Sequence, residues 1–266
     1  MHTFRLAVAT RCWSSPLVEV LPQIFALGIK GIQLDVRHEF PPESLGETGR
    51  RDFLHRLREH GLQVATTVFP LKYPLASEYQ LERRLEAIQR AMVFSYQLGA
   101  RVLCMRPGVL PEQLDSREGR HWQEVLNDLA RYGNHVGVTL AVAPTLERGQ
   151  KLEIFLQWLK GVQTGPVGVD VDPAALVQGG ASVLDTVKQW YGLVQHVQLR
   201  DAVKLLVGGT EEVPLGEGTV PWLELLALLS EMEYSGWLTA SRAAGENPSR
   251  DVEHAIECIQ RWLHGG

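Results

Sequence analysis

Charged side chains follow most of the short apolar segments in this sequence, and they offer its clearest chemistry. Guanidinium and ammonium groups bind carboxylate and phosphate oxygens, and arginine does so with two parallel hydrogen bonds. Because the chain carries 26 Lys and Arg against 31 Asp and Glu, cations gathered on one face of this acidic protein would attract an anion. The candidates are Arg11, Asp35 with Arg37 and His38, Lys72, Arg106, Arg148, Asp172, Arg200 with Asp201, and Arg242. The other interpretation is that they are ordinary solvated loop residues.

The elements that must position these residues alternate between short strands and longer helices. Strands are predicted over 4–10, 31–36, 62–69, 101–105, 138–142, 167–171, 194–199 and 237–240. Helical spacing predicts helices over 17–27, 43–60, 79–98, 119–132, 151–160, 174–190, 222–232 and 250–263. Eight strand–helix units in about 250 residues predict an α/β fold, a (β/α)8 TIM barrel built by residues 1–266 as one domain.

In such a barrel the carboxyl ends of the strands meet at one face, where the active site lies. The charged candidates all fall at these ends, so we expect them to share that face. The Gly-rich stretch 206–218 is expected to be a long unstructured loop and a candidate active-site flap.

Composition disfavours several classes of partner. The net charge of −5 argues against a protein that coats nucleic acid. No apolar run reaches the about 20 residues that a membrane-spanning helix needs. The cysteines Cys12, Cys104 and Cys258 are odd in number and form no CxxC motif, which argues against a disulfide framework or a structural zinc site. That pattern fits the reducing cytoplasm.

Several motifs occur in order along these predicted strands. They are GVTLAVAP at 137–144, VGVDVDP at 167–173, HVQLRD at 196–201, VPLGEG at 213–218 and YSGWLT at 234–239, with GIKGIQLD at 28–35 and LGARV at 98–102. In these stretches the chain resembles the sugar phosphate isomerase/epimerase group of xylose isomerase-like TIM barrels. The resemblance implies the same barrel, an isomerase or epimerase of carbohydrate metabolism, a sugar phosphate ligand and a homo-oligomer.

The resemblance also implies a set of metal ligands, and most of them are replaced here. Members of the group typically hold a divalent cation with carboxylates from three strands and one histidine, and two of those carboxylates are glutamates that shuttle a proton. Asp172 is retained, but the other ligand positions fall on Ala143, Gln198 and Ser241. A substrate-binding histidine falls on Ala175. Alanine offers no ligand atom, and neutral glutamine and serine are poor partners for a catalytic cation, so we expect no divalent metal.

These considerations assign roles but leave the function class open. We expect Asp172, Arg106 and Lys72 to be catalytic, and Arg11, Asp35, Arg37, Arg148, Gln198, Arg200, Asp201 and Arg242 to bind a small anionic sugar-derived ligand. The chain is then either an enzyme with altered chemistry or a non-catalytic sugar-binding barrel, a pseudoenzyme. The related apurinic endonucleases need a multi-zinc cluster and a basic DNA face, which this sequence does not supply. Asp170 fits either an acid/base pair with Asp172 or an ion pair with an inward Arg or Lys.

Overall fold

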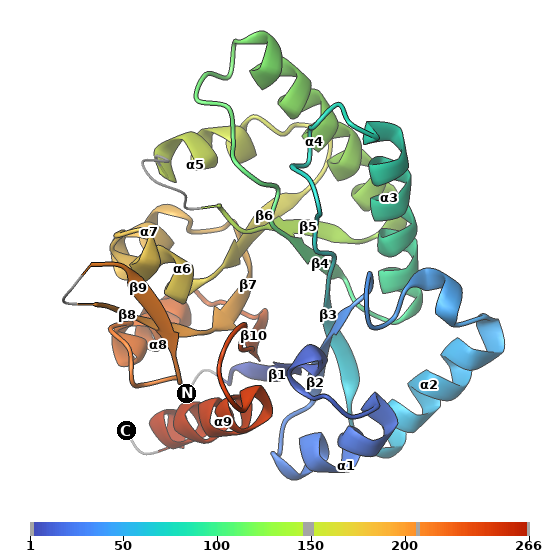
Figure 1. Cartoon of the computed structure of the whole chain (residues 1–266), viewed down its shortest axis with the longest axis vertical. Helices are drawn as coiled ribbons and strands as arrows, with labels where there is room; N and C mark the ends of the chain where they lie inside the picture. The colour runs from blue at the N-terminus through green and yellow to red at the C-terminus, as the bar shows by residue number, and fades with distance from the viewer. Residues whose placement is uncertain (1–2, 146–151, 206–207, 265–266) are drawn as a thin grey trace. The chain divides into compact units, whose positions relative to one another are not determined.

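The strands of this chain form the barrel that the sequence predicts. The computed structural model describes residues 3–145, 152–205 and 208–264 (Figure 1). Eight parallel strands close a barrel in the order β1-β10-β7-β6-β5-β4-β3-β2. Their bounds are β1 Arg5–Ala9, β2 Gly31–Asp35, β3 Gln63–Val68, β4 Val102–Met105, β5 Thr139–Val142, β6 Val167–Val171, β7 Val194–Leu199 and β10 Trp237–Ala240. The α/β TIM-barrel prediction is therefore confirmed, with strand ends within one residue of those expected.

Helices follow the strands along the chain. They are α1 Leu17–Ala26, α2 Glu47–Glu59, α3 Leu81–Gln97, α4 Arg117–Val136, α5 Leu152–Lys160, α6 Pro173–Gln178, α7 Val183–Gln189, α8 Trp222–Glu231 and α9 Pro248–His264. Short 3-10 helices lie at η1 Thr10–Cys12 and η2 Pro42–Ser44. Among the described residues, no helix combines the length and the apolar character that crossing a membrane requires.

Three predicted helices differ from the observed ones by more than two residues at one end. The helix expected over 119–132 continues to Val136. The helical stretch expected around 174–190 is two helices, because α6 ends at Gln178, Gly179 is its C-cap, and Gly180 takes φ +78°, a left-handed conformation that suits glycine. The helix expected from residue 43 begins at Glu47, after η2 and an extended Leu45. At Gly179 and Gly180 the apolar pattern continues across the interruption between the two helices.

The contacts of the chain divide it into two compact units, each described by itself. Unit 1 comprises Met1–Gln33, Asp52–Gln63 and Val171–Gly266, and unit 2 comprises Leu34–Arg51 and Val64–Asp170. The expectation of a single domain stays a prediction.

In unit 1, β1 pairs with both β10 and β2. A Cβ at Gly31, the first residue of β2, would lie 2.5 Å from the ring of Trp237 and 2.8 Å from the Cβ of Ala7. The guanidinium carbon of Arg5 lies 4.0 Å from the centre of the same ring. Glycine is therefore required at position 31, because the Trp237 ring fills the space that a side chain would need.

In unit 2, buried hydroxyl groups join β3 to α3. The Thr67 and Ser95 hydroxyl oxygens lie 2.6 Å apart, and Ser95 donates to the carbonyl of Ala91 at 2.7 Å. The amphipathic α4 also packs here against α3, and it begins at Ser116, whose hydroxyl accepts a hydrogen bond from the amide of Gly119. These bonds satisfy polar groups that would otherwise be costly to bury.

The stretch expected to be an unstructured loop instead contains part of a hairpin. In unit 1, β8 Asp201–Lys204 and β9 Thr210–Val213 pair antiparallel, and α6 lies against β8. The prediction of an unstructured loop over 206–218 is therefore wrong for β9; residues 206–207 lie outside the described part of the chain. Figure 1 shows this hairpin between β7 and α8 in the chain.

Asp201 anchors both ends of that hairpin. Its carboxylate accepts hydrogen bonds from the amides of Ala202, Gly216 and Val220 and from the indole N–H of Trp222, at 2.9 to 3.2 Å. A Cβ at Gly218 would lie 1.8 Å from the Asp201 Oδ1 atom. The glycine of the 213–218 motif thus leaves room for this carboxylate.

Candidate ligand-binding site

Asp172 and Arg200 form a buried ion pair at the carboxyl ends of β6 and β7 in unit 1. The Asp172 Oδ1 atom caps α6 by accepting from the amide of Ala175 at 3.2 Å, and Oδ2 accepts from Arg200 Nη1 at 2.5 Å. Burial alone would lower the pKa of Arg200, but the carboxylates of Asp172 and Glu212 outweigh it and raise that pKa. Arg200 is therefore a permanent internal cation beside Asp172.

Glu212 extends this pair into a cluster. It lies on β9, and its Oε1 atom accepts from Arg200 Nε at 2.9 Å and lies 3.6 Å from Arg242 Nη1. The backbone amide of Ala243 donates to both carboxylate oxygens, at 3.2 and 3.3 Å. Arg242 also donates from Nε to Asp251 at 2.8 Å. We call Asp172, Arg200, Glu212, Arg242 and Asp251 the arginine–carboxylate cluster.

One donor of this cluster lacks an acceptor within the described residues. The Arg242 side chain is only 9% exposed, and its buried Nη1 atom forms no hydrogen bond there. The carboxylate oxygen Oε1 of Glu212 lies 3.6 Å from this atom. A buried donor without an acceptor costs about 1–3 kcal/mol. Sequence reasoning located Asp172, Arg200 and Arg242 but missed Glu212 and Asp251. Glu212 fell in the stretch expected to be a loop, and only the pairing of β9 with β8 brings it to the arginines.

Gln198 and Ser241 lie beside each other at the ends of β7 and β10. The Ser241 hydroxyl donates to Gln198 Oε1 at 3.0 Å, and both side chains are buried. At the two positions where the resemblance implies a histidine and a glutamate, unit 1 thus holds two neutral groups that bond to each other. With the Arg200 guanidinium on Asp172, these donors do not fit a divalent cation.

The other predicted residues of unit 1 have different surroundings. Arg11 is exposed on η1. Asp201 is buried and its carboxylate holds the hairpin ends, as described above. Its observed contacts within unit 1 are those of a structural anchor.

In unit 2, Asp35 organises the turn after β2. Its Oδ1 atom accepts from the amides of Arg37 and His38 at 2.8 and 3.0 Å, and Oδ2 lies 2.9 Å from His38 Nδ1. Arg37 donates from Nη1 to the carbonyl of Pro70, and its guanidinium carbon lies 5.3 Å from the centre of the Phe69 ring. These bonds fix the direction in which Arg37 leaves the turn.

The remaining candidates of unit 2 separate into two groups. Arg37 and Lys72 line one cavity, whereas Arg106, which donates from Nη1 to the carbonyl of Pro144 at 3.4 Å, does not line it. Arg148 lies outside the described residues.

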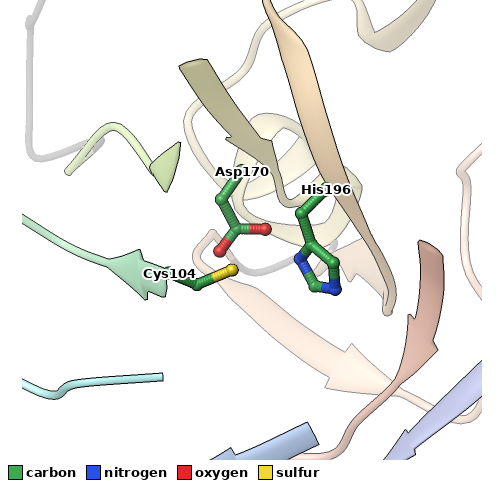
Figure 2. Close-up of side chains that lie close together, drawn as sticks. All are labelled: Cys104, Asp170 and His196. Atoms are coloured by element: carbon green, nitrogen blue, oxygen red, sulfur yellow. The ribbon is translucent and has the colours of Figure 1, made fainter. Parts of the chain in front are cut away.

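Two further buried polar side chains of unit 2 point toward one another. Figure 2 shows the Asp170 carboxyl group beside the sulfur of Cys104. Burial raises the pKa of the Cys104 thiol well above its ordinary value, and the charge of Asp170 raises it further. Cys104 is therefore an inert thiol at neutral pH rather than a nucleophile.

His196, which Figure 2 also draws, belongs to unit 1. It is fully buried on β7, and its Nε2 atom lies 2.7 Å from the hydroxyl of Thr239 on β10. This bond gives the ring a polar partner inside the protein.

Comparison with known proteins places the chain in a family. Residues 21–262 match the family model described as the xylose isomerase-like TIM barrel. The chain belongs to this family. No curated protein matches it.

Solved structures of similar fold cover nearly all of this xylose isomerase-like barrel. A xylose isomerase domain protein from Planctomyces limnophilus is 18% identical, with a TM-score of 0.81 over 98% of this chain and 96% of that one. A D-tagatose 3-epimerase-like protein is 16% identical, with a TM-score of 0.77 over 98% and 97%. A xylose isomerase-like protein from Mycobacterium smegmatis, solved in complex with magnesium, is 14% identical, with a TM-score of 0.78 over 99% and 98%. At these identities the likeness shows the fold alone.

Proposed function

We propose that this barrel binds a small anionic sugar-derived ligand at the carboxyl ends of its strands in unit 1, without a divalent metal. The observation that supports the proposal is the pair of largely buried arginines at the ends of β7 and β10: Arg200, and Arg242, whose Nη1 makes no hydrogen bond in the described part of the chain and lies 3.6 Å from Glu212 Oε1. A carboxylate or phosphate oxygen of a ligand is the acceptor that a guanidinium group binds most strongly.

Metal independence is supported by the charges around Asp172. The carboxylate that the resemblance assigns to a cation already accepts from Arg200 and from the first turn of α6. A divalent ion would have to displace the guanidinium group, and the two neighbouring ligand positions of the resemblance offer it the neutral side chains of Gln198 and Ser241. Binding of the ligand is therefore proposed to rest on arginine and hydroxyl donors.

A second candidate is a barrel that binds the ligand without converting it. The residues at three strand ends favour it, because Ala143, Gln198 and Ser241 cannot accept and return a proton near neutral pH. Turnover by the altered enzyme would need a base other than the two glutamates of the related proteins.

The test is a binding screen with neutral sugars, sugar acids and sugar phosphates in the presence of EDTA. We expect anionic sugars to raise the Tm with the concentration dependence of simple ligand linkage, and EDTA to have no effect. Arg242→Gln should weaken the ligand Kd about tenfold or more, since it removes a charge-assisted hydrogen bond. The exposed Arg250→Gln is the matched control and should leave Kd unchanged.

Different outcomes of this screen would contradict the different parts of the proposal. If binding appears only when Mn²⁺ or Mg²⁺ is added, metal independence is wrong. If no anionic sugar shifts the Tm, or if Arg242→Gln binds as tightly as Arg250→Gln, the assignment of the ligand to this cluster is wrong. Incubation of the bound ligand followed by product analysis separates the converting enzyme from the binding protein.

A further inference from the structure

Unit 2 contains a cavity of about 500 Å³, and no residue of the arginine–carboxylate cluster lines it. Three segments of the chain line it. They are the turn and η2 after β2 (Val36, Arg37, Pro41, Pro42, Glu43), the segment after β3 (Phe69, Lys72, Tyr73), and the start of α3 with the residues before it (Tyr79, Gln80, Arg83, Arg84, Ala87, Arg90). A volume of this size is within the range of small-molecule sites.

The lining of this cavity is strongly cationic, although the chain is acidic. Four arginines and one lysine face a single carboxylate, that of Glu43. Concentrating positive charge in a concave surface raises the local concentration of anions. The cavity therefore favours a ligand with more than one negative charge.

The cations differ in how far their donors are already used. The donors of Arg84 are already used within the protein. They bond to the carbonyls of Leu75 and Tyr79 at 3.0 Å each and also to that of Ser77. It thereby fixes the segment that carries Tyr79. By contrast Lys72, Arg83 and Arg90 are exposed, and they form no hydrogen bond or ion pair within the described residues. These three side chains have donors available for a ligand.

The geometry of α3 directs two of these cations to one side. Arg83, Ala87 and Arg90 are spaced four and three residues apart, so they lie on one face of the helix. Ala87, which lies between them on this face, has a small side chain and also lines the cavity. The α3 N-terminus, which favours anions, also lies here, and Gln80 before it takes φ +52° and makes no capping side-chain bond.

Aromatic rings provide the apolar part of the wall. The rings of Tyr73 and Tyr79 meet edge to face with centroids 5.1 Å apart, and they are 39% and 57% exposed. The Lys72 ammonium nitrogen lies 5.6 Å from the centre of the Tyr73 ring. Exposed rings beside free cations suit a ligand that joins a flat or apolar group to a charged one.

We propose that this cavity binds a small phosphate ester, with its phosphate oxygens on Arg83, Arg90 and Lys72 and its organic group against Tyr73 and Tyr79. A phosphate monoester carries up to two charges and three acceptor oxygens, so it suits a cavity lined by several cationic donors better than a single carboxylate does. The inference goes beyond the proposed function, since it holds whether or not unit 1 binds a sugar.

The experiment measures phenyl phosphate binding by calorimetry at constant ionic strength, with inorganic phosphate, benzoate and phenol as comparisons. We expect phenyl phosphate to bind more tightly than inorganic phosphate or benzoate, and phenol to show no binding. Arg83→Gln combined with Arg90→Gln should weaken the phenyl phosphate Kd about tenfold or more. The matched control, Arg51→Gln with Arg58→Gln, changes two exposed arginines of α2 and should stay within about twofold.

Three outcomes overturn the inference. Equal weakening in the α2 control would show that net charge alone drives binding. Equal affinity for benzoate would show that the cavity does not select phosphate. Unchanged affinity in the α3 variant would place the ligand elsewhere. Arg242→Gln separates this inference from the proposed function, because it should weaken binding of the anionic sugar about tenfold or more while leaving the phenyl phosphate Kd unchanged.

Discussion

Removing the guanidinium group of Arg200 provides the most direct test of the arginine–carboxylate cluster. In Arg200→Met, Asp172 and Glu212 lose their counter-ion. The loss occurs in a buried place, since the side chains of Arg200, Asp172 and Glu212 are 11%, 1% and 7% exposed. Breaking a buried ion pair from one side costs about 3–5 kcal/mol of unfolding free energy. With an unfolding entropy of about 2.1 cal/mol/K per residue, or about 0.56 kcal/mol/K for the 266-residue chain, the Tm should fall by about 5–9 °C.

The pH dependence of this loss distinguishes charge from packing. A buried carboxylate without its cation is stabilised by protonation, so Arg200→Met should lose more stability at pH 8 than at pH 5. Differential scanning calorimetry at both pH values measures the effect. Adding Asp172→Asn should recover part of the loss, whereas Arg250→Met, on the surface, should change the Tm little. A loss below about 1 kcal/mol that is equal at both pH values would refute the assignment of Arg200 as the counter-ion.

Two further predictions concern metal binding and the buried thiol. Gln198→His with Ser241→Glu should bind Mn²⁺ in a calorimetric titration only when Arg200→Met is added; binding without that third change would contradict the exclusion of cations by Arg200. Because burial and Asp170 raise the pKa of Cys104, the folded thiol keeps its proton above about pH 8.5, where the unfolded thiol loses it. Stability should therefore fall with rising pH above that value, by up to about 1.4 kcal/mol per pH unit. Urea unfolding at pH 8 and 9.5 should show a smaller fall in Cys104→Ala, and an equal fall would count against a protonated Cys104.

The strands and most helices could be predicted because their apolar periodicity is local. The hairpin could not, because the strand Thr210–Val213 contains two glutamates and reads as a polar loop. Its position depends on pairing with β8 and on the ion pairs of Glu212 with Arg200 and Arg242, which the composition of the segment does not reveal. Similarly, the break at Gly179 and Gly180 lies within a stretch whose apolar pattern alone is typical of a helix.

The cations of the candidate site and Asp172 could be predicted, but the other carboxylates that pair with these cations could not. Fold and sequence spacing place Arg200 and Arg242 after strands, yet the carboxylates that neutralise them come from a hairpin and from α9. Arg83 and Arg90 lie on a helix, where arginine is usually a solvated residue, and only tertiary packing brings them to the cavity that Arg37 and Lys72 line. Spacing along the chain carries no signal for such contacts.

The anchoring of the hairpin by Asp201 has a consequence for how this scaffold could change. Asp201 is paired with Val213, and its carboxylate also binds the amides of Gly216 and Val220, so the chain leaves the barrel and returns to it at one point. Insertions between these two ends would lengthen the excursion without shifting β7 or α8, and a longer closed loop adds little entropic cost. A changed segment between Asp201 and Val220 could thus alter ligand preference with little loss of barrel stability, provided that Asp201 and Gly218 are kept.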